Sequence, residues 1–464
     1  TSFGLLLQQS LTPRGRRALG AYYTPRAYIE RLVRPTIEEP LRADWQAVEQ
    51  QVRALLCREP AGPPADAADA AVARVRDFHA QLGRLRILDP VCGVGNFLYV
   101  TLAVLQQLEA EVQALFAILA PPAGPWVSQL DTAQLLGLEV EPRVREVAAL
   151  VLGIGALQAH LRSYGTSHPL PAAVFADRGS LQCRDAVLTG GGAEAGADGP
   201  AAPRPAAWPP ADFVIGNPPF IGSRLMRATQ GAGYTQALRA AYPEVPKSAD
   251  YVLYWWHKAA ELCRRQQLRR FGFITTKALG QKLDRQMIGR QLGATPPLAL
   301  VFVIPNHPWH CAAYRARRAT RRQQRAEVRI AMTVAEAGRC PGVVWTVARE
   351  RRDASGPAEV ELTAAAGLIH SDLTVGVDLT AVRPLRANLQ LCSPGVKLHG
   401  AGFIVTAAQA AALGLGTVPG MAQRVRPYRN GKDLMAHSRQ GFVIDLQGLS
   451  EPEARREFPS LAAW

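Results

Sequence analysis

Short apolar runs recur along the chain, and each one ends at a turn or at a charged residue. Runs of this length are typical of buried strands, while the longer stretches between them have the apolar spacing of helices. The runs that we interpret as strands are residues 86–89, 135–139, 213–215, 271–276 and 298–305. The aromatic residues of the helix predicted over 249–268 fit a buried core. Strands that alternate with helices predict an α/β fold.

The two ends of the chain differ from this central pattern. The N-terminal stretch is helical in character, and we expect one helix to begin with Thr24 as its N-cap and Pro25 in its first position. From about residue 376, short strands, glycine turns and basic residues replace the helical pattern. We therefore predict three parts, namely a helical segment over 1–84, a central domain over 85–375 and a second, incomplete domain over 376–464.

The predicted strand at 213–215 stops abruptly at Asn217-Pro218-Pro219-Phe220. Each proline fixes its own φ and keeps the residue before it extended. The Asn217 carboxamide and the Pro218 carbonyl are therefore two acceptors with nearly fixed directions, beside the aromatic face of Phe220. This set suits gripping an exocyclic amino group by both N–H bonds while a flat ring stacks on Phe220. The alternative is a plain turn, because Asn and Pro are common turn residues.

A glycine-containing loop follows the predicted strand at 86–89. Gly93 and Gly95 let the backbone adopt positive φ and pass close to a ligand. Asp89 ends the strand and can accept from a cationic or amino head group, and Phe97 begins the next helix. The loop lacks the third glycine of a dinucleotide fingerprint, which argues against NAD.

Two further strands are followed by acidic residues. We expect Glu139 to hold ribose hydroxyls, as acids at this position do in nucleoside-binding α/β folds. Glu139 is preferred to Glu141 because Glu141-Pro142 is typical of a helix start. Asp185 follows a third short apolar segment. The helix that we expect to begin at Thr24 offers free N–H groups and a partial positive charge, which suit a carboxylate.

The charge balance adds a partner to this picture. The 464 residues include 53 Lys and Arg against 38 Asp and Glu, for a net charge of +15. Such an excess favours a polyanionic partner, most simply nucleic acid, although a basic bias of the whole proteome is the alternative. The run from Arg315 to Arg325 is the best local candidate for phosphate contacts, with a solvated helix face as the alternative.

The cysteines and the apolar runs bear on metal binding and location. The seven cysteines are scattered without metal-knuckle spacing, so we predict no metal site and a reducing cytoplasm. The longest apolar run, residues 147–157, is short of the roughly 18 residues that a membrane span needs. No membrane association is therefore expected. The chain opens on Thr1 rather than Met, and both ends look cut, so we expect a fragment.

Four motifs stand in one order along the chain, namely Gly-Ala-Tyr-Tyr-Thr-Pro, Asp-Pro-Val-Cys-Gly-Val-Gly-Asn-Phe, Gly-Leu-Glu-Val-Glu-Pro and Asn-Pro-Pro-Phe. This order resembles the gamma-class DNA adenine-N6 methyltransferases. More narrowly, the chain is similar to the type IIL combined restriction–modification methyltransferases and related phage-defence methylases. The resemblance implies a Rossmann-like fold dependent on S-adenosylmethionine (SAM), with a mixed seven-stranded sheet and a partial C-terminal target-recognition domain. It also implies methylation of adenine N6 at specific sites in double-stranded DNA, with the base flipped out of the duplex.

The resemblance further implies a role for each motif residue. Thr24 and the turn before it touch the methionine end of SAM, Glu139 holds the ribose, and Asp185 accepts from the adenine amino group. The implied catalytic residues are Asn217, Pro218, Pro219 and Phe220. The implied cofactor-binding residues are Tyr23, Thr24, Pro25, Asp89, Pro90, Cys92, Gly93, Gly95, Phe97, Glu139, Asp185 and Asn217.

Other activities remain open at this point. A glutamine methyltransferase shares the Asn-Pro-Pro core, and an RNA adenine methylase fits the same charge. An inactive SAM-fold module kept for DNA binding is a third alternative, which the intact Asp89, Glu139 and Asn217 argue against. The expected partners are double-stranded DNA and restriction or defence subunits, or a nuclease domain upstream of Thr1.

Overall fold

The computed structural model describes the following residues: 24–57, 65–120, 127–164, 179–190, 202–281, 284–309, 328–351, 359–378, 382, 385–388, 401–435 and 440–464. Contacts divide the chain into two compact units, Thr1–Ala381 and Val382–Trp464. The three-part division proposed from the sequence stays a prediction. Tyr23 and the run from Arg315 to Arg325 lie outside the described residues.

A mixed sheet forms the middle of the first unit. Its strands are β1 (Ile87–Asp89), β2 (Leu135–Glu139), β3 (Leu181–Cys183), β6 (Phe213–Gly216), β7 (Arg270–Thr276), β8 (Leu298–Pro308), β9 (Arg329–Ala337), β10 (Gly342–Arg351) and β11 (Glu359–Gly367). They lie in the order β11-β10-β8-β9-β7-β6-β1-β2-β3. Five adjacent strands, β7, β6, β1, β2 and β3, are mutually parallel. β9 is antiparallel to both of its neighbours, β7 and β8.

The sheet confirms the predicted α/β class and is larger than the seven strands expected. The two additional strands extend it beyond β8, since β10 pairs parallel with β8 and β11 pairs antiparallel with β10. Many of the β10 positions are exposed, and its apolar stretch over residues 343–348 was not predicted as a strand. β6 is buried along its whole length, as expected for a strand covered on both faces.

Alternate residues of the central strands feed two hydrophobic cores. Ile87 and Phe213 pack on one side of the sheet, and Leu88 and Val214 pack on the other. This alternation follows from the pleat of a strand, which sends successive side chains to opposite faces. Both faces therefore carry helices, which explains the uninterrupted hydrophobicity of these runs.

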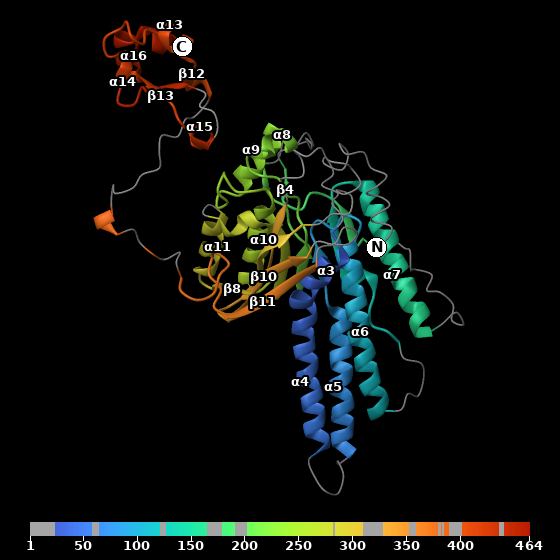
Figure 1. The fold of residues 1–464 in the computed structure, drawn as a ribbon. Coiled ribbons are helices and arrows are strands. Elements are labelled where there is room, and N and C mark those ends of the chain that lie inside the picture. Colours follow the sequence, from blue (N-terminus) through green and yellow to red (C-terminus); the bar gives the residue numbers. More distant parts are fainter. Residues whose placement is uncertain are drawn as a thin grey trace. The chain divides into compact units, whose positions relative to one another are not determined.

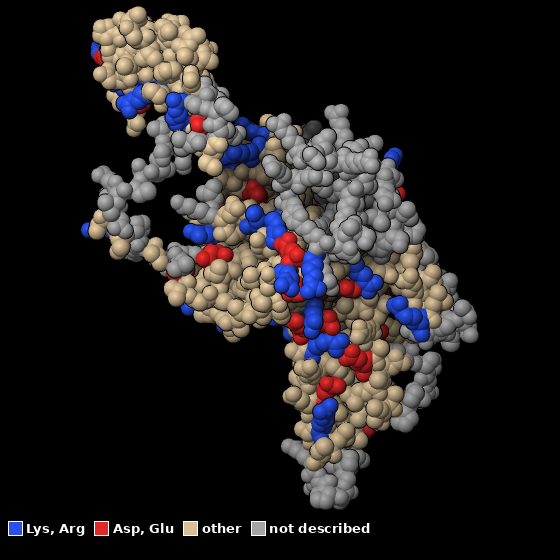
Figure 2. Space-filling model, viewed as in Figure 1, with Lys and Arg blue, Asp and Glu red and all other residues tan. Residues whose placement is uncertain are grey.

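One face is covered by helices from the first part of the chain. They are α3 (Arg26–Val33), a π-helical turn η1 (Arg34–Glu38), α4 (Glu39–Leu56), α5 (Ala65–Arg84), α6 (Asn96–Leu119) and α7 (Pro142–Tyr164). Figure 1 shows α4, α5 and α6 side by side, running past the sheet. Oppositely charged side chains are mixed over these helices in Figure 2, and Arg42 pairs with both Glu38 and Glu111.

The other face is covered mainly by helices that follow β6. They are α8 (Met226–Gln230), α9 (Ala232–Ala241), α10 (Val252–Arg264) and α11 (Asp284–Leu292). The short pair β4 (Leu188–Thr189) and β5 (Arg204–Pro205), and the turns η2 (Thr132–Gln134) and η3 (Lys277–Gly280), complete the first unit's connections. α10 is rich in aromatic residues, and Tyr254 and Trp256 are fully buried against the sheet.

Two helices, α6 and α7, are long and apolar enough to cross a membrane by length and composition alone. In this fold α6 contacts α3, α5 and α7 as well as β1 and β2. α7 contacts α6, β2 and β3. Part of their apolar surface, including Leu98, Leu105 and Leu152, is therefore buried against the sheet and its covering helices.

The second unit has its own small core. Its three-stranded antiparallel sheet has the order β12 (Ile404–Val405), β14 (Phe442–Ile444) and β13 (Val425–Pro427). Short helices accompany it: α13 (Ala407–Ala412), α14 (Met421–Arg424), α15 (Gly431–Met435), α16 (Glu451–Glu457) and α17 (Pro459–Ala463). Buried residues from several of these elements pack together, including Val405, Met421, Ile444 and Phe458.

Candidate active site at the carboxyl edge of the parallel strands

Four adjacent parallel strands, β3, β2, β1 and β6, bring their carboxyl ends to one edge of the sheet. Asp89 and Glu139 are the last residues of β1 and β2. Asp185 follows β3, and Asn217 follows β6. The polar residues singled out in the sequence are thus gathered at the edge where open α/β sheets bind ligands.

Asp89 is buried, with only 1% of its surface exposed. Its Oδ1 accepts a hydrogen bond from the Val91 amide at 3.1 Å, while its Oδ2 is buried without a hydrogen-bond partner among the described residues. Burial, supported by the nearby Glu139, raises the pKa of the Asp89 carboxyl to about 8. A buried acceptor without a donor is costly, so this atom is suited to a ligand that brings one.

The strand next to Asp89 passes so close that only glycine fits. A Cβ on Gly216 would lie 2.8 Å from Asp89 Oδ1. Gly216 is the last residue of β6 and directly precedes Asn217. The absence of a side chain at this position therefore lets the Asp89 carboxylate and the Asn-Pro-Pro-Phe loop lie side by side.

The glycine loop turns sharply between β1 and α6. Gly93 and Gly95 have φ of +52° and +78°, which L side chains rarely adopt. The Gly93 amide donates to Glu139 Oε2 at 3.1 Å, and a Cβ on Gly93 would meet no other described residue within 4 Å. The loop thus offers an open stretch of backbone beside two acids. Cys92 is buried, and its amide donates to the Leu138 carbonyl at 3.0 Å, so it fixes the loop against β2.

Glu139 is held by backbone donors from two sides. Its Oε1 accepts from the amides of Val140 and Glu141 at 2.9 and 3.0 Å. Burial raises the pKa of the Glu139 carboxyl. A carboxylate has about four lone-pair sites, so acceptor capacity remains for a hydroxyl ligand. α7 begins at Pro142, as predicted from the Glu141-Pro142 pair.

Asp185 is tied into a network that the sequence did not reveal. Its Oδ1 accepts from the amides of Val187 and Leu188 at 2.7 and 3.1 Å. Its Oδ2 accepts from the hydroxyl of Tyr234, which lies 2.7 Å from the hydroxyl of Tyr251. The two tyrosines connect Asp185 to α9 and to the residue before α10. The sequence alone does not identify these two tyrosines as site residues, because tyrosine is as common in protein cores as in binding sites.

The Asn217 side chain reaches the start of α3. Its Nδ2 donates to the hydroxyl of Thr24 at 3.0 Å, and its Oδ1 is buried without a hydrogen-bond partner among the described residues. The prediction that Thr24 is the N-cap of the helix was wrong by one residue, since Pro25 occupies that position without a side-chain cap. The Thr24 hydroxyl is instead engaged by Asn217.

Phe220 belongs to an aromatic wall at the same site. The centroid of its ring lies 6.0 Å from the ring centroid of Trp309 in an edge-to-face arrangement. The Trp309 and Tyr28 ring centroids are 5.6 Å apart, and Tyr28 belongs to α3. The Tyr28 hydroxyl donates to the Pro308 carbonyl at 2.8 Å. β8 therefore continues to Pro308 rather than ending in a turn near residue 305, and His307 is buried within it beside Tyr28.

The remaining predicted residues support the loops from behind. The Pro90 carbonyl accepts from the indole N–H of Trp255 at 3.2 Å. Phe97 is buried in the first turn of α6, and Pro218 is buried while Pro219 is half-buried. Within the described residues, no cluster of three or more His, Cys, Asp or Glu could hold a metal ion.

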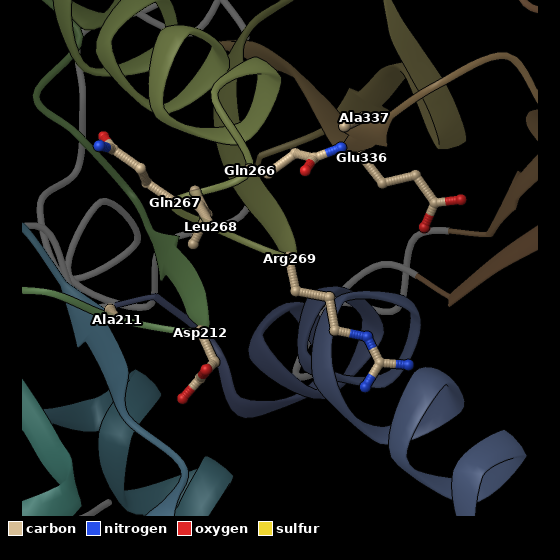
Figure 3. Close-up of a pocket in the computed structure, with 8 residues that line it drawn as sticks. All are labelled: Ala211, Asp212, Gln266, Gln267, Leu268, Arg269, Glu336 and Ala337. Carbon is tan, nitrogen blue, oxygen red and sulfur yellow. The ribbon is translucent and has the colours of Figure 1, made fainter.

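A separate pocket of about 410 Å³ lies at the opposite edge of the sheet, where the strands begin (Figure 3). Asp212, which precedes β6, accepts from the Arg86 amide there at 2.7 Å. Arg269, which precedes β7, donates to both oxygens of Asp44 at 2.6 and 3.0 Å. The charged groups of this pocket thus stabilise the fold, and the pocket is distinct from the edge that carries the motifs.

The mixed sheet, its glycine loop and the strand-end acids define a Rossmann-like fold of the methyltransferase class. A family model described as "MmeI, DNA-methyltransferase domain" matches residues 65–319, more than half of the chain. The chain belongs to this family.

Two individual proteins are also similar to this chain. "DNA methyltransferase A" of Bacillus subtilis (strain 168) is 22% identical over 284 residues, which are 60% of this chain and 28% of that protein. The structure of the type IIL restriction-modification enzyme MmeI in complex with DNA matches with a TM-score of 0.56 and 18% identity, over 99% of this chain and 55% of that one. The latter likeness shows a shared fold, and this chain spans only part of the length of both proteins.

Proposed function

We propose that the protein is a site-specific DNA methyltransferase that transfers a methyl group from SAM to adenine N6 in double-stranded DNA. The observation that carries this proposal is the buried Oδ1 of Asn217, which lacks a partner among the described residues while its Nδ2 is bound to Thr24. Membership of the MmeI methyltransferase-domain family supports the same reaction class.

The residues at the sheet edge fit SAM. Asp89 offers a buried carboxyl oxygen, without a hydrogen-bond partner in the described part of the chain, for a cationic or amino group. The loop at Gly93 offers open backbone, and Glu139 offers acceptor capacity for ribose hydroxyls. Asp185 would accept from the adenine amino group, through capacity beyond its bond to Tyr234. SAM, when bound, supplies an electrophilic methyl group.

Adenine N6 is a poor nucleophile because its lone pair is delocalised into the ring. Two hydrogen bonds from N6, to Asn217 Oδ1 and to the Pro218 carbonyl, would favour a pyramidal nitrogen whose lone pair is free to attack the methyl carbon. The carbon–sulfur bond would break as the nitrogen–carbon bond forms, the sulfur would leave as a neutral thioether, and N6 would lose its proton to solvent after the transfer. Both acceptors also stabilise the positive charge that grows on N6, so orientation and electrostatics replace a strong general base. The base must leave the duplex to reach these acceptors, and Phe220 would stack on it.

The test is methyl transfer from labelled SAM to DNA, followed by identification of the methylated nucleoside. Long-read sequencing of DNA from cells that express the protein would first identify the target site. N6-methyladenine in DNA, lost in Asn217→Ala, is the expected result. Label on RNA or on protein glutamine instead of DNA would mean that the same acceptors act on a different substrate. Binding of DNA without any methyl transfer would indicate an inactive module.

The wider setting follows from the same proposal. Restriction or defence subunits, or a nuclease domain outside these residues, would complete a restriction–modification system in the cytoplasm. The unit Val382–Trp464 would be part of a target-recognition domain, and the net charge of +15 would favour DNA at both units.

A further inference from the structure

The segment that follows the Asn-Pro-Pro-Phe motif is fixed in place by three contacts. The Ile221 carbonyl accepts from the Tyr251 amide at 2.9 Å, and the Ser223 amide donates to Asp250 Oδ1 at 3.0 Å. Met226, the first residue of α8, is completely buried. These contacts anchor both ends of the turn, so the residues between them are presented from a rigid support.

Leu225 lies in this turn with 63% of its surface exposed, directly beside the buried Met226. Its amide donates to the Gly222 carbonyl at 2.9 Å, which closes the turn. A single exposed leucine is ordinary on a protein surface. The position of Leu225 is less ordinary, because it is five residues past Phe220 on the same fixed loop.

The charged residues of the segment that carries Leu225 are basic, and the acid Asp250 contacts this segment through the Ser223 amide. From residue 213 to 243 the chain contains Arg224, Arg227 and Arg239 and no Asp or Glu. Arg224 and Arg227 are exposed, and neither forms an ion pair with another described residue. An exposed apolar side chain flanked in the sequence by two exposed arginines suits DNA, where phosphates flank a stack of flat bases.

We propose that Leu225 is a positioning residue that enters the DNA base stack where the target adenine has left it, while Arg224 and Arg227 contact the flanking phosphates. The inference rests on the proposed function. It adds that the Leu225 side chain stabilises the DNA with the target adenine extruded. Extrusion of a base costs stacking and pairing energy, and an apolar wedge that fills the gap offsets part of that cost.

The experiment compares Leu225→Ala with wild type in single-turnover methylation of two duplexes, one with the target adenine correctly paired and one with it mismatched. A mismatched base is easier to extrude. We expect the variant to be slower by roughly tenfold or more on the paired duplex, which corresponds to a change of about 1.4 kcal/mol in the barrier. On the mismatched duplex most of the loss should disappear.

Matched variants separate the wedge from a general effect. Leu368→Ala removes a leucine of similar exposure, 60%, that follows β11, and it should methylate both duplexes at the wild-type rate. Leu225→Met should retain most of the activity. Arg227→Ala should weaken DNA binding and lower the salt slope by about one, because one phosphate contact is lost.

A fluorescent 2-aminopurine at the target position reports extrusion directly. Its signal on binding should be weaker with Leu225→Ala than with wild type. A wild-type rate for Leu225→Ala on paired DNA, or an equal loss on both duplexes, would overturn the wedge while leaving the proposed function intact. If the wild-type protein transfers no methyl group to DNA adenine, the proposed function fails and the wedge fails with it.

Discussion

The carboxamide nitrogen of Asn217 donates a hydrogen bond to the hydroxyl of Thr24 at 3.0 Å, across 193 positions of the chain. This contact fixes the rotation of the amide, so its oxygen is the atom left to accept from a ligand. That oxygen is buried and has no hydrogen-bond partner among the described residues. Thr24, just before α3, therefore orients the Asn217 side chain.

The first prediction concerns this orienting contact. Thr24→Val keeps the shape of the side chain but removes the acceptor for Asn217 Nδ2, which leaves a buried donor unsatisfied at a cost of about 1–3 kcal/mol. The amide is then free to turn, and we expect the single-turnover rate to fall while Thr24→Ser stays near wild type. Calorimetry with SAM provides the control. A Thr24→Val variant whose only defect is weaker SAM binding would contradict the orienting role.

The second prediction concerns Asn217 itself. Asn217→Ala removes one of the two acceptors for the target amino group, and by analogy with an oxyanion-hole donor this should cost about 2.7–4 kcal/mol in the barrier. SAM affinity should change little, because Asp89 and Glu139 are the proposed main anchors of the cofactor. Single-turnover transfer of labelled methyl to the target duplex measures the effect. A near wild-type rate would reduce Asn-Pro-Pro-Phe to a turn.

The strand-end residues could be predicted from the sequence because their signals are local. Asp89, Glu139 and Asn217 each follow an apolar run directly, and parallel strands bring such ends to one edge of the sheet. The Thr24–Asn217 contact and the Tyr234–Asp185 contact could not be predicted in this way. Both depend on packing between elements that are far apart in the sequence.

Three strands of the sheet, β9, β10 and β11, were not predicted from the sequence. β11 carries many exposed and charged positions and has no long apolar run, whereas β9 and β10 contain apolar stretches, residues 330–335 and 343–348, that were not interpreted as strands. β11 contains three consecutive alanines, Ala364–Ala366, which have little strand preference of their own. β11 joins the sheet by pairing with β10, and β10 joins it by pairing with β8. Such pairing is a tertiary effect.

The third prediction is a pH dependence of SAM binding. The pKa of Asp89 is raised to about 8 by burial, so below that pH the free protein holds a neutral carboxyl. An ionised carboxylate attracts a cationic ligand more strongly, so we expect SAM affinity to increase as the pH rises through about 8. Asp89→Asn should bind weakly and lose this dependence, while Glu141→Gln should retain it. Titration calorimetry measures SAM affinity between about pH 7 and about pH 9. The role of Asp89 would be disproved if the affinity of wild type and of Asp89→Asn changed with pH in the same way.

The fourth prediction applies the same shift to stability. An acid whose folded pKa lies above its unfolded value, near 3.9 for Asp, binds a proton more tightly in the folded state. Its contribution to the free energy of unfolding therefore falls as the pH rises from about 4 to about 8. Asp89→Asn removes this loss of stability with rising pH. The Tm of the variant minus the Tm of wild type should therefore increase from about pH 4 to about pH 8. Melting curves at several pH values measure the difference, and a constant offset would count against it.

The fifth prediction concerns Phe220, whose ring packs edge-to-face on Trp309 at 6.0 Å. This contact holds the Phe220 ring at a fixed angle, ready to stack on a base. Phe220→Ala should weaken the hold on the flipped adenine by about 1–3 kcal/mol, because base–aromatic stacking contributes that much. Phe220→Tyr keeps the aromatic face and should keep most of the activity. The discriminating measurement is the rate as a function of DNA concentration at saturating SAM. The stacking role requires a loss for alanine that tyrosine restores, whereas equal losses for both variants would indicate that Phe220 only supports the wall formed with Trp309.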